Sequence, residues 1–156
     1  MNDVQASLNY YAQRNCSEQW RVFLSEMISE FYDQVDGGMA ESFFHRVGTR
    51  LAQALPLPPC GSLDEVATGL NRLFDQIEWG WVEVREAGNH IQIVHGAYPV
   101  VPMYQNAPEA WILPVLEGAY TEWFRSLGGQ PELQAKVVSP PESPFFPVEL
   151  SYGRHG

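Results

Sequence analysis

Residues 79–95 read WGWVEVREAGNHIQIVH, with apolar and polar side chains alternating on both sides of a break at Ala87-Gly88-Asn89. Alternation with a period of two is typical of β-strands that bury one face, and a short break with Gly and Asn suits a hairpin turn. The stretch therefore predicts two antiparallel strands, at 81–86 and 90–95. It decides the fold class, because the sequence before it has a different period.

Three helices are predicted before the hairpin, since apolar residues recur there three and four positions apart. The apolar stripes comprise Trp20, Leu24, Met27, Ile28, Phe31 and Val35; then Phe43, Phe44, Val47, Leu51 and Leu55; then Val66, Leu70, Leu73, Phe74 and Ile77. We expect Ser17 to cap the first helix and Gly37-Gly38 to end it. The second helix should run from Met39 until Pro56 forbids its continuation.

Helix boundaries are also marked further along the chain. Ser62 can accept a hydrogen bond from the amide of Glu65 while the Glu65 carboxylate reaches back, which is the capping box of a third helix. Beyond the hairpin, a helical run starts at Pro108 and ends at Gly128-Gly129. We expect Pro114 either to kink this helix or to mark its true beginning.

The remaining segments predict two more strands, at 133–138 and 146–152, joined by a proline-rich connection. Helices come first and strands then surround one further helix, which predicts an α+β domain with a small, mainly antiparallel sheet. We interpret residues 1–15 as an N-terminal arm, either extended or a short helix, and residues 16–156 as a single α+β domain.

Composition limits the classes of partner. The chain has 156 residues, a formal net charge of -10 and 45% hydrophobic residues, so it can bury a core but repels phosphate backbones and anionic lipids. We therefore expect no nucleic-acid partner. No stretch reaches the length of a membrane span, so we expect no membrane insertion either. Met1 to Arg14 lacks the pattern of a secretory signal, and Cys16 and Cys60 are too few for a disulfide framework. These features favour the cytoplasm.

No catalytic or metal constellation is predicted. His90 and His95 are five residues apart on one predicted strand, so they point to opposite faces and cannot share a metal ion. Cys60 precedes a helix, which is a weak indication of a reactive thiol. A structural role as a buried residue of the turn is the favoured interpretation. Glu117 is the most interesting acid, because it lies among aromatic residues; a hydrogen-bonding role in the fold is the favoured interpretation.

The aromatic content is the positive signal. The chain holds 5 Trp, 7 Tyr and 8 Phe, more than a core of this size readily hides. Exposed Tyr and Trp are enriched both at protein interfaces and on surfaces that stack against sugars. The surplus therefore suggests self-association. Tyr10 and Tyr11 in the arm are part of this surplus.

Several pieces between Gly38 and Leu127 follow one another in a distinctive order. They are Gly38-Met39-Ala40, Pro59-Cys60, Ile77-Glu78-Trp79-Gly80-Trp81-Val82, Ile91-Gln92-Ile93-Val94-His95 and Trp111-Ile112-Leu113-Pro114-Val115-Leu116-Glu117-Gly118-Ala119-Tyr120, with Trp123 nearby. In order and spacing they resemble the bacterial cellulose synthase operon protein D family. The resemblance makes Tyr10 and Tyr11 candidates for contacting a glucan chain, or for anchoring the arm to its own or a neighbouring subunit. The residues that we assign a structural role from this motif are Trp79, Gly80, Trp111, Pro114, Glu117, Gly118, Tyr120 and Trp123.

The resemblance implies a homo-octamer built as a ring of dimers, which guides nascent glucan chains or aligns synthase complexes. It implies other synthase subunits, and in some members a proline-rich cellulose-complementing protein, as partners. The leading hypothesis is thus a non-catalytic, oligomeric scaffold subunit with no cofactor, aiding export, alignment or crystallisation of glucan. A fainter likeness in topology to V4R-type ligand-binding domains suggests the alternative, a small-ligand-binding or regulatory adaptor. The third hypothesis is a carbohydrate-active enzyme using Glu117 together with another acid.

Overall fold

The computed structural model of the protein describes residues 3–101, 111–142 and 145–155. These residues form α1 (Asp3–Asn15), α2 (Glu18–Gln34), α3 (Gly37–Ala54), α4 (Leu63–Ile77), β1 (Trp81–Ala87), β2 (His90–Gly96), α5 (Ile112–Ser126), β3 (Leu133–Ser139) and β4 (Val148–Arg154). Helices come first and strands follow around α5, which confirms the predicted α+β class.

The strands form one sheet in the order β1-β2-β4-β3, and every neighbouring pair is antiparallel. The predicted hairpin is confirmed: β1 pairs with β2 so that Trp81 lies opposite Gly96. The last strand begins at Val148 rather than at residue 146. It starts directly after Pro147, whose nitrogen has no hydrogen to donate to a ladder.

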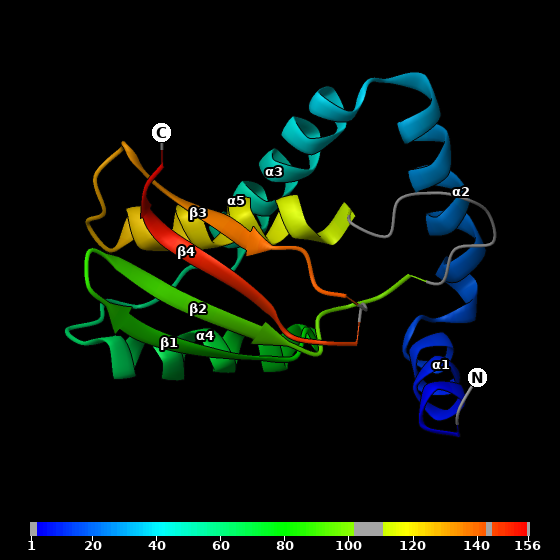
Figure 1. The fold of residues 1–156 in the computed structure, drawn as a ribbon, viewed down its shortest axis with the longest axis horizontal. Helices are drawn as coiled ribbons and strands as arrows, with labels where there is room; N and C mark the ends of the chain where they lie inside the picture. The colour runs from blue at the N-terminus through cyan, green and yellow to red at the C-terminus, as the bar shows by residue number, and fades with distance from the viewer. Residues whose placement is uncertain (1–2, 102–110, 143–144, 156) are drawn as a thin grey trace.

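Helices α4 and α5 cover one face of the sheet, and α3 packs along α5 (Figure 1). The core lies between these layers and combines inward-facing strand residues such as Val82, Ile93 and Leu150 with Phe74 of α4 and Leu116 of α5. Residues on the opposite parity of β1, such as Glu83 and Arg85, are exposed, as expected for a sheet with one buried face.

One predicted helix end is wrong. Gly37-Gly38 does not end α2 but forms the first turn of α3, because Asp36 acts as an N-cap and its Oδ1 accepts from the Met39 amide at 2.8 Å. The chain leaves α2 through an extended Val35 instead. Glycine pairs suit either a helix end or a helix start, so only the capping contact distinguishes them.

The other helix starts are closer to expectation. Ser17 stands at the N-cap of α2 but makes no side-chain capping bond. Ser62 Oγ does accept from the Glu65 amide at 3.2 Å, and the Glu65 carboxylate reaches back to the Gly61 amide at 2.5 Å. Pro114 lies in the first turn of α5, where a missing N–H costs nothing, so it marks a beginning and not a kink. The expected start at residue 108 lies outside the described residues.

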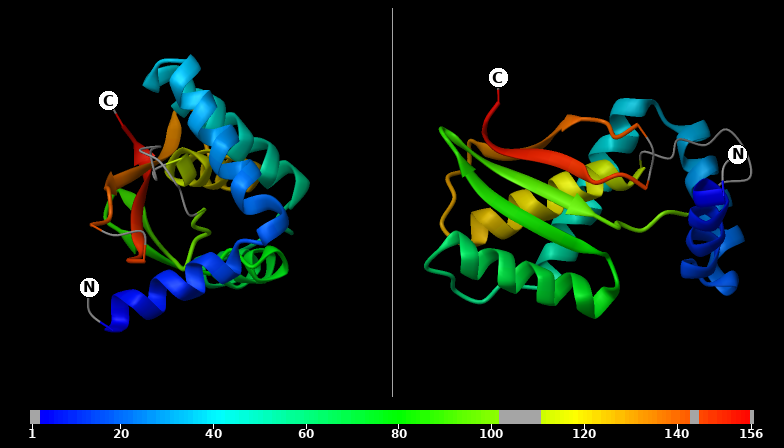
Figure 2. Two further views of the ribbon diagram at one scale, coloured as in Figure 1. Left: turned by 90° about the vertical axis from the view of Figure 1, so that its right-hand side faces the viewer. Right: turned by 60° about the horizontal axis from the view of Figure 1, so that its bottom comes forward.

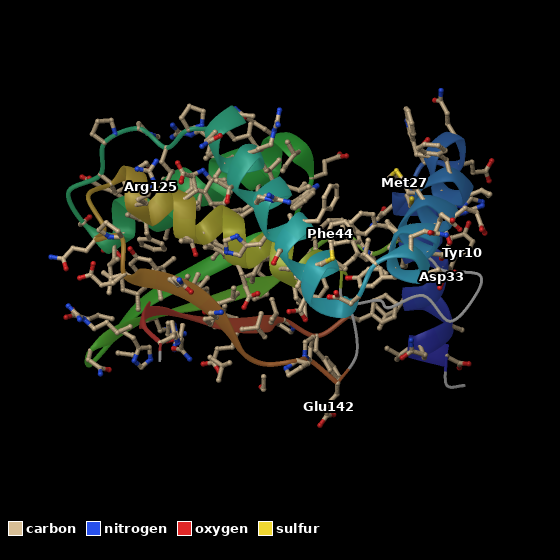
Figure 3. The ribbon with its side chains drawn as sticks, turned by 90° about the horizontal axis from the view of Figure 1, so that it is seen from above. Tyr10, Met27, Asp33, Phe44, Arg125 and Glu142 are labelled. Carbon is tan, nitrogen blue, oxygen red and sulfur yellow. The ribbon has the colours of Figure 1, made fainter. Side chains whose placement is uncertain are left out.

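Helices α1 and α2, residues 3–34, stand together at one end of the molecule, and we call them the helical arm (Figures 1 and 2). Its main ring contacts with the rest of the protein lie near the α2–α3 junction, where Phe31 is 4.5 Å from Phe43 and Tyr32 is 5.8 Å from Phe44 between ring centroids. Phe44 lies between α3 and the arm in Figure 3. None of the described helices combines the length and apolarity needed to cross a bilayer.

Candidate functional site

The motif residue Gly118 lies where two helices touch. A Cβ atom built on Gly118 would stand 1.9 Å from the His45 carbonyl oxygen of α3, and one built on Gly48 would stand 1.9 Å from the Val115 carbonyl oxygen of α5. The backbones of α3 and α5 are therefore in direct contact through two glycines, one from each helix. No side chain fits at either position without separating the helices.

Tyr120 belongs to a buried hydrogen-bonded group that joins α5 to the sheet. His95 Nδ1 is 2.6 Å from the Tyr120 hydroxyl, and His95 Nε2 is 2.7 Å from the Trp79 carbonyl oxygen. A carbonyl oxygen only accepts, so Nε2 carries the proton and the Tyr120 hydroxyl donates to Nδ1. Both nitrogens of the imidazole are thus satisfied inside the core.

Burial sets the charge state of this group. Desolvation lowers the pKa of His95 to about 4, opposed in part by the hydrogen bond to Trp79. Burial also raises the pKa of Tyr120 well above its ordinary value. At neutral pH both side chains are uncharged, which suits a structural network and not an acid or base that must exchange protons with a substrate.

Glu117 contacts the edge of the sheet. Its Oε2 accepts from the backbone amide of Val137 at 2.9 Å, and Thr121, one helical turn later, accepts from the amide of Ala135 at 2.9 Å. Both amides belong to β3, an outer strand of the sheet. The acid that the sequence singles out therefore faces a backbone donor.

The opposite outer strand has an equivalent contact. Asn71 of α4 donates through Nδ2 to the Val82 carbonyl oxygen at 2.9 Å and accepts through Oδ1 from the Val82 amide at 3.0 Å. One side-chain amide thus supplies the two hydrogen bonds that a residue of a neighbouring strand would supply to Val82. Helix side chains engage both outer strands of the sheet.

The remaining motif residues also lie within the folded body. Trp123 is buried and its Nε1 donates to the Leu55 carbonyl oxygen at 2.8 Å, which holds the end of α3. Gly80 has a φ of 86°, and a Cβ there would meet the Gly96 carbonyl oxygen at 2.0 Å, so only glycine fits the turn into β1. Trp111 and Trp79 are half-buried.

Other candidates for chemistry are dispersed. Cys60 is half-buried and its Sγ lies 3.2 Å from the Pro58 carbonyl oxygen. His95 is buried, whereas His90 is half-exposed near the hairpin turn. Within residues 3–101, 111–142 and 145–155, no three His, Cys, Asp or Glu side chains converge as a metal site would require.

The arm, in contrast, exposes large apolar side chains. Trp20, Phe23 and Met27 follow one another along α2 and are 51%, 57% and 48% exposed; we call them the α2 stripe. In Figure 3, Met27 lies on the arm, well apart from the α5 end marked by Arg125. The predicted stripe of this helix thus contributes Ile28 to the core but leaves Trp20 and Met27 outside it.

A second exposed stripe follows on α3. Met39, Phe43 and Val47, each four residues after the last, are 59%, 41% and 40% exposed, and we call them the α3 stripe. Phe31, one helical turn after Met27 on α2, contacts Phe43 of the α3 stripe at 4.5 Å between ring centroids. Six large apolar side chains exposed on two successive helices are more than scattered surface residues would give.

Tyr10 and Tyr11 lie on α1 and are 53% and 62% exposed. Their rings meet edge-on at 5.7 Å, and the Arg14 guanidinium stands 5.0 Å from the centre of the Tyr10 ring. The guanidinium and the ring attract each other, which favours this position of the Tyr10 ring. Both tyrosines belong to α1 in the arm, whereas the motif residues belong to the body, so the candidate residues fall into two separate groups (Figure 1).

Sequence reasoning missed three residues of the body: Gly48, Asn71 and Thr121. Gly48 in a helix interior costs stability, and that cost is the available signal that something approaches closely there. Asn71 within an apolar helix carried a similar signal. Thr121 had none, because threonine is common on half-buried helix faces.

These features define a class of protein: a small α+β protein whose motif residues build its interior and whose exposed apolar side chains lie on a helical arm and the adjoining α3. Comparison with known proteins gives the family. Residues 6–150 match the family described as the D subunit of cellulose synthase, and the chain belongs to that family. The resemblance noted in the sequence is confirmed.

The relatives carry the same description. A cellulose synthase operon protein D from Komagataeibacter xylinus is 32% identical over 110 residues, which are 69% of this chain and 70% of the relative. A second from that species is 29% identical over 117 residues, 74% and 75% of the two chains. One from Komagataeibacter sucrofermentans is 28% identical over the same length and shares. The family is an accessory subunit of cellulose synthase and not its catalytic subunit.

Proposed function

We propose that this chain is a non-catalytic, self-associating scaffold subunit that helps a cellulose synthase complex to export, align or crystallise nascent glucan. The observation that carries the proposal is the apolar surface of the α2 and α3 stripes, which the subunit itself leaves exposed. Exposed apolar surface of this extent is typical of association sites. Family membership supplies the biological setting.

The chemistry of the body supports a role without catalysis. Glu117, the acid that would serve a glycosidase best, accepts from the Val137 amide, and His95 is held neutral in the core. Glycoside hydrolysis needs two carboxyl groups facing each other across a substrate cleft. Glu117→Gln keeps an acceptor for the Val137 amide, so we expect cellulose yield to be unchanged; a loss of yield with intact folding would favour the enzyme hypothesis.

Partners and location belong to the same proposal. We place the subunit on the cytoplasmic side with copies of itself and with other synthase subunits, and in systems that possess one, with a proline-rich cellulose-complementing protein. An octamer built from dimers is the expected assembly. Tyr10 and Tyr11 contact glucan or anchor the arm, and their exposure on α1 allows either role.

The test combines mass in solution with cellulose formation. Light scattering of the purified chain at micromolar concentration should give a multiple of 17.6 kDa. Expression in a cellulose producer that lacks its own member of this family should restore the amount or crystallinity of cellulose. A monomer that restores nothing would overturn the proposal, and a monomer carrying a co-purified small molecule would favour the ligand-binding alternative.

A further inference from the structure

The charges beside the two apolar stripes have opposite signs. On α2, Glu26 follows Phe23 by three positions and Glu30 follows Met27 by three, so these acids lie beside the α2 stripe. On α3, basic residues take the same relation to the apolar residues. Arg46 follows Phe43 by three positions and Arg50 follows Val47 by three.

All four charged residues are exposed. The chain has 9 Lys and Arg residues against 19 Asp and Glu, so two arginines side by side on one helix face are notable. Ion pairs between described residues involve Arg21, Arg85, Arg125 and Arg154, whereas Arg46 and Arg50 form none. Their guanidinium groups are therefore available to carboxylates of another molecule.

Within one subunit the two stripes cannot cover each other. Rings of α2 and α3 meet near the junction, at Phe31, Tyr32, Phe43 and Phe44, and the short connection through Val35 and Asp36 sets the helices apart beyond it. Trp20 and Phe23 lie towards the far end of α2 and keep more than half of their surface exposed.

We infer that the α2 stripe of one subunit packs on the α3 stripe of a second copy, with Glu26 and Glu30 facing Arg46 and Arg50. This inference rests on the proposed self-association and adds to it the surfaces that meet. In a two-fold pair the contact occurs twice, because each copy offers one acidic and one basic stripe. The apolar residues supply the affinity, and the charges supply direction and select α2 against α3.

The available area fits a specific interface. Each of the six stripe residues exposes about half of a large side chain, so each can bury up to about 100 Å². In a two-fold pair the six residues of each copy are all covered, so the total buried area approaches the roughly 1,200 Å² at which stable interfaces begin. Contact of α2 with another α2 would instead place Glu26 and Glu30 against the same acids, which costs free energy.

The test is charge reversal with mixing. The variant R46E/R50E makes both stripes acidic, and E26R/E30R makes both basic, so each variant alone should raise the midpoint concentration of self-association by about tenfold or more. An equimolar mixture offers acid to base at both contacts and should return the midpoint to within about threefold of wild type. Sedimentation velocity at low and moderate salt measures these midpoints, and circular dichroism verifies that each variant is folded.

The controls separate local from general charge. R72E/K136E changes the net charge as much as R46E/R50E does, on the exposed Arg72 of α4 and Lys136 of β3, and should associate like wild type. E26R/E30R lowers the net negative charge, so weaker association of that variant cannot come from overall repulsion.

The outcomes distinguish the α2–α3 contact from the more general scaffold proposal. Loss in both variants with recovery on mixing supports the α2–α3 contact. Wild-type association that neither reversal weakens, or that mixing does not recover, overturns the contact and leaves the scaffold proposal standing. A wild-type chain that stays monomeric at all concentrations overturns both.

Discussion

The folded body and the helical arm treat apolar residues in opposite ways. In the body, α3 and α5 approach until their backbones touch at Gly48 and Gly118, and Tyr120 and His95 satisfy each other inside. In the arm, Trp20 and the rest of the α2 stripe remain about half exposed. The core of the body buries its apolar residues within one chain, whereas the arm and the adjoining α3 stripe leave apolar side chains exposed. Mutations should therefore affect folding in the core of the body and association in the two stripes.

The largest effect is expected at the helix contact. Gly118→Ala places a Cβ 1.9 Å from the His45 carbonyl oxygen, which forces α3 and α5 apart and should lower the free energy of unfolding by on the order of 4 kcal/mol. Urea denaturation measures the change. Gly37→Ala is the matched control, because a Cβ there meets nothing within 4 Å, and it should change stability by less than about 0.5 kcal/mol.

The second effect depends on pH. Because the pKa of His95 is lowered to about 4 in the folded chain, the unfolded chain binds a proton first as pH falls. The stability from neutral His95 is complete above about pH 6.5 and is lost between there and pH 4, by about 3 kcal/mol. NMR titration should show one histidine that stays neutral down to about pH 4; four histidines titrating near pH 6.5 would contradict the buried network.

A smaller effect is expected at the sheet edge. Asn71→Ala removes both hydrogen bonds to the Val82 backbone and should cost about 2 kcal/mol. Asn71→Asp keeps the acceptor for the Val82 amide but loses the donor, so its stability should lie between those of the wild-type chain and of Asn71→Ala. Thermal unfolding of the three chains gives the order, and equal stability of Ala and Asp variants would argue against the strand-like contact.

The smallest effect on folding is expected from α1, the N-terminal part of the helical arm. Deleting residues 1–15 removes α1 with Tyr10 and Tyr11, whose side chains are mostly exposed, so the free energy of unfolding should change by less than about 0.5 kcal/mol. Cellulose organisation or partner binding should change more than folding does. A truncated chain that fails to fold would reverse this part of the comparison, and the division of the chain at residue 15 would have to be abandoned.

Local patterns explain what could be predicted from the sequence. Alternation across 81–95 is a property of neighbouring residues, so the hairpin and the α+β class followed from it. The direction in which an apolar stripe points is not local: the period that buries Ile28 also places Met27 in solvent. Periodicity identifies a helix but does not say whether its apolar face meets its own core or another molecule.

Contacts between distant segments explain what could not be predicted. The sequence singles out Glu117, but its partner Val137 is 20 residues away and is set only when β3 docks on α5. The close approach of Gly48 and Gly118 joins two helices separated by the entire hairpin. Gly37-Gly38 was misplaced for a simpler reason, since Asp36 could cap a helix as readily as the glycines could end one.

Side chains of α4 and α5 bond to the outer strands of the sheet, and these bonds matter where many copies of the chain are crowded together. Asn71, Glu117 and Thr121 together occupy backbone groups that an added strand of another molecule would need, so joining sheets side by side would first require breaking four hydrogen bonds. At the high local concentration that the proposed assembly creates, these bonds oppose amyloid-like growth. Copies of the chain then associate through their helices, and such an assembly stops growing once the matching helix faces are covered.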